Sequence, residues 1–106
     1  MLVGGIYTDL GMFDSSSKKL QAALQLSQVS ANKLLEAEVL YKIGKNSYYQ
    51  GLHSDALQTW QTALDLARVV NCNSLEISVR LSMANALADL GNYPIAMQIY
   101  MELLRN

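Results

Sequence analysis

The stretch LADLGNYPIAMQIY, residues 87–100, reads as the end of one helix, a turn centred on Gly91, and the start of a second helix that carries Pro94, the only proline of the chain. Two similar stretches precede it: YTDLGMFDSSSKKL (residues 7–20) and SYYQGLHSDALQTW (residues 47–60). The central glycines Gly11, Gly51 and Gly91 recur every 40 residues. A constant interval of this length indicates a repeat protein.

Other positions follow the same period. The columns are Val3/Ile43/Met83, Gly4/Gly44/Ala84, Phe13/His53/Tyr93, Ser16/Ala56/Ala96, Leu20/Trp60/Tyr100, Ala23/Ala63/Leu103 and Leu24/Leu64/Leu104. Within a unit the apolar spacing is helical, as Ala56, Trp60 and Ala63 fall at i, i+4 and i+7. We predict an all-α fold with three two-helix units, at about 1–30, 31–70 and 71–106. The expected helices lie at about 2–10, 14–29, 32–50, 54–70, 73–90 and 94–105.

The repeated glycines stand where a left-handed residue ends a helix. The residues that we expect to cap the following helices are Asp14, Ser54 and Asn92. Pro94 then falls in a first turn, where its missing N–H has no intrahelical partner to lose.

Gly4 and Gly44 fall inside predicted helices, where glycine costs roughly 1 kcal/mol relative to alanine. Close contact between the two helices of a unit explains them. We expect this column to face the small residues at 16, 56 and 96, and Trp60 to be buried in the core.

The second unit also carries the residues of a known pattern. In LYKIGKNSYYQGLHSDALQTWQTAL (residues 40–64) the matching positions are Leu40, Ile43, Gly44, Ala56, Trp60 and Ala63. The chain therefore resembles the tetratricopeptide repeat family, and the resemblance covers almost all of it. The chain departs from the family in its repeat period, which is 40 residues where the family has about 34. It also departs from the family pattern at Arg80, Ser47 and Leu103. A longer-helix variant of the family accommodates the longer period.

The resemblance implies an α-solenoid of three helix hairpins, with about six antiparallel helices and a concave face that binds a peptide or helix of a partner protein. The chain would then be an adaptor or a regulatory segment of a larger protein. HEAT and armadillo repeats, with periods of about 40–47 residues, are the structural alternative. Those families do not predict a glycine-centred turn followed by a small residue five positions later.

The ligand-facing positions that the resemblance implies lie beside the packing stripe of the first helix in each unit. They are Glu38, Tyr41, Lys45, Tyr48, Tyr49, Leu81, Asn85 and Asp89. Tyrosine supplies rigid contact area, and Lys45 and Asn85 supply hydrogen bonds. The alternative for Tyr48 and Tyr49 is that they pack against the next unit.

Charge and composition argue against several classes of function. The formal net charge is -1 and basic residues are scattered, so we expect no nucleic acid or membrane partner. No run of eighteen apolar residues is present, which argues against a membrane span. Cys72 is the only thiol, which excludes an internal disulfide and favours a reducing, cytoplasmic setting. The N-terminal residues lack the pattern of a secretory signal.

Motifs for catalysis are missing from the sequence. His53 is the only imidazole, and it shares its column with Phe13 and Tyr93, so we expect it to pack at a turn. No His/Cys cluster has the spacing of a zinc site, and the glycines of LVGGIY (residues 2–7) lack the Lys of a phosphate-binding loop. We therefore expect no enzyme, cofactor or metal.

The ends of the repeat array suggest a second hypothesis. Stacked repeats need polar caps, and we expect either a fragment of a larger protein or a homo-oligomer that covers its ends. The residues that we expect to contact a partner surface at this end are Ile95, Ile99, Met101 and Leu103. The alternative function is thus a structural segment that self-associates.

Overall fold

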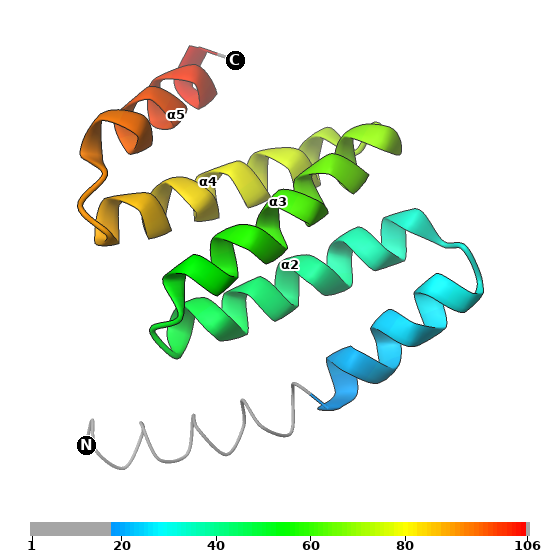
Figure 1. Ribbon diagram of the computed structural model, residues 1–106. Helices are drawn as coiled ribbons and strands as arrows, with labels where there is room; N and C mark the ends of the chain where they lie inside the picture. Colours follow the sequence, from blue (N-terminus) through cyan, green and yellow to red (C-terminus); the bar gives the residue numbers. More distant parts are fainter. Residues whose placement is uncertain (1–17, 106) are drawn as a thin grey trace, which may run out of the picture.

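The computed structural model describes residues 18–105, and over this range the chain is helical with short turns (Figure 1). A helical segment at 18–29 is followed by α2 (Lys33–Tyr49), α3 (His53–Val69), α4 (Asn73–Asp89) and α5 (Tyr93–Arg105). The all-α prediction is confirmed for this range, and the bounds of the last four predicted helices agree to within one residue. The predicted helix at 2–10, the start of the helix at 14–29, Gly4, Gly11 and Asp14 lie outside the described residues.

Helices start at equal intervals, because α2, α3, α4 and α5 begin 20 residues apart. The turns before them are 30–32, 50–52, 70–72 and 90–92. In every turn the N–H of the third residue bonds to the carbonyl five residues earlier, at 2.8 or 2.9 Å. The middle residue has a positive φ, and it donates to the carbonyl three residues earlier. This is the Schellman arrangement, which ends a helix and reverses the chain within three residues.

The left-handed position is held by glycine in only two of the turns. Gly51 and Gly91 both have φ 86°, as the sequence predicts, whereas Ala31 has φ 56° and Asn71 has φ 57°. Alanine pays a steric cost in this conformation that glycine does not. The sequence therefore reveals the turns that end α2 and α4 more clearly than the other two.

The predicted caps are only partly correct. Leu52, not Ser54, is the N-cap of α3, and it has no side chain that can bond to the helix. Ser54 is wrong as a cap because the Schellman turn starts α3 one residue earlier than expected, which puts Ser54 inside the first turn. Asn92 precedes α5 as expected. Asn32, which we did not predict, caps α2 by accepting from the N–H of Leu35 at 3.1 Å.

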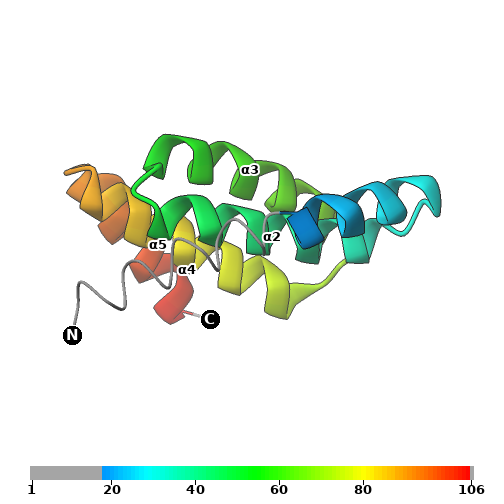
Figure 2. The same cartoon turned by 90° about the horizontal axis from the view of Figure 1, so that it is seen from below.

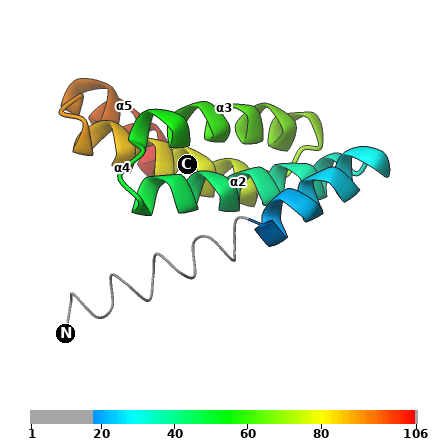
Figure 3. The same ribbon diagram turned by 60° about the horizontal axis from the view of Figure 1, so that its bottom comes forward.

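Successive helices run in opposite directions and lie beside one another in chain order, from the segment 18–29 to α5 (Figure 1). Each helix from α2 to α5 contacts the next, and α2 also contacts α4. Figure 2 shows α3 on one side of α2 and α4, and Figure 3 shows the tight turn that joins α2 to α3. This arrangement leaves one side of α2 uncovered by α3.

The core is centred on Trp60, which is 1% exposed. Its indole Nε1 donates to the backbone carbonyl of Tyr41 at 3.0 Å. A Cβ added to Gly44 would lie 2.3 Å from that nitrogen, so the mid-helix glycine makes room for the indole. The sequence correctly predicts a close approach at Gly44 and a buried Trp60, and the three atoms nearest to a Cβ at Gly44 all belong to the indole.

Exchanging residues at the left-handed positions tests the turn geometry. Ala31→Gly should raise the free energy of unfolding by about 0.5–1 kcal/mol, because glycine relieves the positive φ. Gly51→Ala should lower it by about 1 kcal/mol, since its Cβ would meet no atom within 4 Å and only the backbone strain remains. Urea unfolding measures both changes, and equal signs for the two variants would contradict the assignment.

Gly44→Ala should destabilise the chain by about 1–3 kcal/mol through its clash with the indole. Helix propensity alone would stabilise the same variant by about 1 kcal/mol. The control is the same substitution in a Trp60→Val background, which lacks the clashing ring atoms. In that background Gly44→Ala should stabilise the chain. A destabilisation that persists after loss of the indole would show that another contact is responsible.

Candidate functional site

The best-defined polar cluster joins the end of α2, the start of α3 and the end of α4. The hydroxyl of Tyr48 donates to Asp89 Oδ2 at 2.5 Å, and His53 Nε2 lies 3.3 Å from the same oxygen. The Tyr48 ring packs edge-on against His53, with centroids 4.8 Å apart, and lies 5.8 Å from Trp60. One carboxylate thus links both ends of the α2–α3 turn to α4.

The charge of Asp89 is stabilised by these neighbours. The hydrogen bond from Tyr48 lowers the pKa of the Asp89 carboxyl, and the hydrogen bond and charge of His53 act in the same direction. The same contact raises the pKa of Tyr48 to about 12, aided by desolvation and by the negative charge of Asp89. The cluster therefore favours a carboxylate beside a neutral phenol over a wide range of pH.

His53 is held at both ring nitrogens. Nδ1 lies 3.1 Å from the carbonyl of Gly51, and Nε2 faces Asp89. Both partners only accept hydrogen bonds, so the imidazolium satisfies both contacts and a neutral ring satisfies one. The prediction that His53 packs at a turn is confirmed, because it is the first residue of α3 and contacts Tyr48.

Four of the predicted site residues take part in contacts between helices. Tyr41 pairs its hydroxyl with Ser82 Oγ of α4 at 3.2 Å, and Tyr48 reaches Asp89 on the same helix. Asn85 accepts a hydrogen bond from the hydroxyl of Tyr100 on α5. Tyr48 thus contacts the following unit, as the alternative for this residue states, and Tyr41 does the same.

Three predicted residues remain accessible on α2. Glu38 is exposed, Tyr49 is 63% exposed and stacks edge-on against Tyr48, and Lys45 is half-buried with its Nζ 5.5 Å from the centroid of the Tyr41 ring. The ring thus orients the ammonium group through a cation–π contact. These side chains lie on the part of α2 that faces away from the core.

Leu34 and Lys42 lie on the same side of α2 and are also exposed. Sequence reasoning missed both, although their helical spacing from Glu38 was a signal. We call the resulting row the α2 strip; its members are Leu34, Glu38, Lys42, Lys45 and Tyr49.

Leu81, on α4, is also accessible. It is 44% exposed, whereas Tyr41, which is 40 residues earlier, is covered by contacts with α4. Arg80 stands where the preceding unit has Leu40, and it forms an ion pair with Glu102 of α5. A charged residue is tolerated there because its partner lies on the neighbouring helix.

Possible metal ligands do not cluster in the described part of the chain, and the imidazole is held by two contacts. Among residues 18–105, no group of three or more His, Cys, Asp or Glu side chains is placed to hold a metal ion. The two nitrogens of the single imidazole are already directed at Gly51 and Asp89. In the same range no helix combines the length and the apolar character needed to cross a bilayer.

Comparison with known proteins adds no relative, since no family model, curated protein or solved structure matches the chain.

The Tyr48–Asp89 contact predicts two windows of pH-dependent stability. The pKa of Tyr48 is higher in the folded chain than its ordinary value of about 10, so this stabilisation is complete below that pH and is lost as the pH rises through about 12. The pKa of Asp89 is lowered, so its stabilisation is present above the ordinary value of about 3.9 and is lost as the pH falls further.

Tyr48→Phe removes the Tyr48 effect and the largest contribution to the Asp89 effect, while His53 still faces Asp89. The difference in unfolding free energy between wild type and this variant should shrink from about pH 9 to 12 and again below about pH 4. Urea unfolding at a series of pH values measures it, with Tyr93→Phe, an exposed tyrosine, as the control. A difference that stays constant across both windows would rule out the contact.

Proposed function

We propose that this chain is a solenoid segment of the tetratricopeptide type and that it binds a segment of another protein along the α2 strip. The equal helix intervals and repeated Schellman turns support the repeat architecture. Gly44 and Trp60, two positions on which the family resemblance rests, are in close contact in the core. The contact between α2 and α4, one unit apart, is also what stacking of hairpins requires.

The observation that carries the proposal is the accessible α2 strip itself. It places two lysines, one glutamate, one leucine and one tyrosine along a single helix face. Mixed apolar and charged side chains of this kind suit a peptide, because the apolar groups anchor it and the charges select among sequences. The Tyr48–Asp89 and Tyr41–Ser82 contacts hold the face in place before any ligand arrives.

The chemistry of the strip defines the ligand. Lys42 and Lys45 outnumber Glu38, so a segment with acidic side chains is favoured. Tyr49 and Leu34 offer apolar contact at either end of the row. The proposed ligand is therefore an acidic peptide or helix with apolar residues at its ends.

In this proposal the chain acts as an adaptor or regulatory segment in the cytoplasm, without a catalytic step. The single half-buried thiol of Cys72, at the N-cap of α4, is consistent with a reducing compartment.

Selection from a random peptide library tests the α2 strip. Peptides selected on the wild-type chain should be acidic, and they should bind Lys45→Glu at least about tenfold more weakly. Binding measured by calorimetry provides the comparison. Lys19→Glu, which reverses an exposed charge on the segment 18–29, is the matched control and should bind as wild type does.

Two results would overturn the proposal. One is a set of selected peptides whose affinity is unchanged in both Lys45→Glu and Tyr49→Ala, since the strip would then not be the binding surface. The other is a library that yields no peptide that binds the folded wild-type chain.

A further inference from the structure

Helix α5 is apolar on more than the face that it buries. Its 13 residues include only three with charged or amide side chains, Gln98, Glu102 and Arg105. Ala96 is buried, and Ile99 and Leu103 are half-buried, on the side where α5 contacts α4. The polar side chains of α5, Gln98, Glu102 and Arg105, share one face, and its apolar side chains extend beyond the face that packs on α4.

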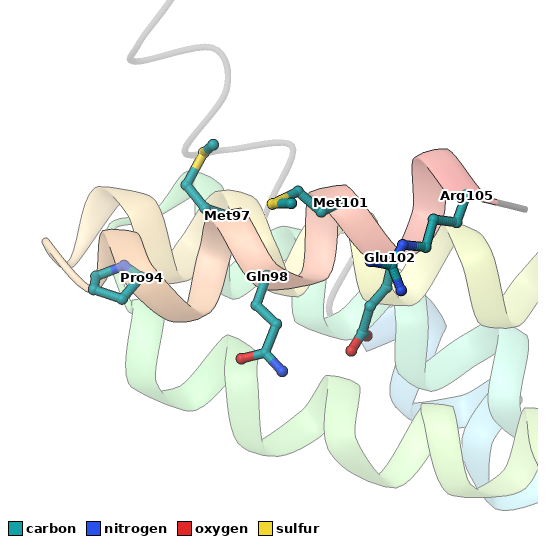
Figure 4. Close-up of a pocket in the computed structure, with 6 residues that line it drawn as sticks. All are labelled: Pro94, Met97, Gln98, Met101, Glu102 and Arg105. Atoms are coloured by element: carbon teal, nitrogen blue, oxygen red, sulfur yellow. The ribbon is translucent and has the colours of Figure 1, made fainter.

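The outer face of α5 carries large exposed side chains. Met97 is 55% exposed, Met101 54% and Leu104 85%. Together with Pro94 they are spaced three, four and three residues apart, which is the a/d spacing of a helix that packs along another helix. Figure 4 shows Met97 and Met101 extending from one side of α5, where they help to line an open hollow of about 330 Å³. We call these four residues the α5 seam.

Comparison with α3 shows which seam positions a further stacked helix would cover and which it would not. The residues 40 positions earlier are Ser54, Leu57, Gln61 and Leu64. Leu57 and Leu64 belong to the core that α3 and α4 share, but Gln61 stays exposed although α4 is packed on α3. A helix stacked on α5 as α4 is stacked on α3 would therefore leave position 101 in water. Stacking of a further repeat helix therefore does not account for a methionine at position 101.

We propose that the α5 seam is a dimer interface and that its occupant is the α5 seam of a second copy of this chain. A twofold contact requires a patch that matches itself, and an uncharged row with two methionines does so, because methionine adapts its shape to its partner. In an antiparallel pair the N-terminal half of each seam lies against the C-terminal half of the other, so Met97 faces Met101 of the second copy.

Charge supports the antiparallel pairing. Arg105 and Gln98 border the seam on one side, and Glu102 is already paired with Arg80. Reversing one helix sets the guanidinium of Arg105 nearer to Gln98 of the other copy than to a second Arg105, so no like charges meet. The helix dipoles also oppose each other in this arrangement.

Sedimentation of the whole chain over a range of concentrations tests the proposal. Wild type should be a dimer that dissociates on dilution, and Met101→Asp should raise the dissociation constant at least about tenfold. Met101→Gln, which copies the α3 residue and leaves the inner face of α5 intact, should weaken the dimer in the same direction. Gln61→Asp is the matched control at an exposed position, and circular dichroism checks that each variant stays helical.

Disulfide crosslinking tests the antiparallel register directly. In a Cys72→Ser background, a mixture of Met97→Cys and Met101→Cys chains should form a crosslinked heterodimer on mild oxidation. Replacing the Met101→Cys chain by Gln61→Cys should abolish it. A wild-type chain that stays monomeric at every concentration, or a dimer unaffected by Met101→Asp and Met101→Gln, overturns the proposal. A monomer would assign the seam to a different polypeptide. None of these results bears on the α2 strip, which lies on another helix.

Discussion

The contact between the Trp60 indole and Gly44 is the constraint on which the rest of the structure depends. The largest side chain of the core can approach α2 this closely only because that helix has no side chain at Gly44. The indole N–H is satisfied by the carbonyl of Tyr41, so burying the ring leaves its nitrogen with a hydrogen-bond partner. This contact fixes how closely α2 and α3 approach, and α4 then packs against the surface that the pair presents.

Much of the fold could be predicted from the sequence because the repeat gives several independent observations of each feature. Glycine favours a positive φ, so Gly51 and Gly91 identify their turns in the sequence. The predicted bounds of the last four helices then agree with the structure to within one residue. The turns at Ala31 and Asn71 have the same geometry but weaker signals, since the hydrogen bonds and tertiary packing hold the strained residue there. The prediction that Ser54 caps α3 was wrong because backbone hydrogen bonds hold this turn, and no particular side chain identifies them in the sequence.

The candidate site was harder to predict, because a helix face shows which residues are neighbours but not which neighbouring helix covers them. Glu38, Lys45 and Tyr49 are accessible as expected, whereas Tyr41 and Tyr48, one turn away from Lys45 on either side, bond to α4. A tyrosine can serve either purpose, since it has both an apolar ring and a polar hydroxyl. For Tyr48, the hydroxyl contacts α4 because folding brings Asp89, which is far away in the sequence, within hydrogen-bond distance.

The two tyrosine contacts between α2 and α4 share one geometric property. Tyr41 reaches Ser82 and Tyr48 reaches Asp89, and in both the partners are 41 residues apart. The attachment points are thus about two helical turns from each other along parallel helices. Two hydrogen bonds at separate points along α2 and α4 resist both sliding and rotation of one helix against the other. They therefore limit changes in the angle between the two hairpins. Any molecule lying across both hairpins would have to match their existing curvature instead of bending them to its own.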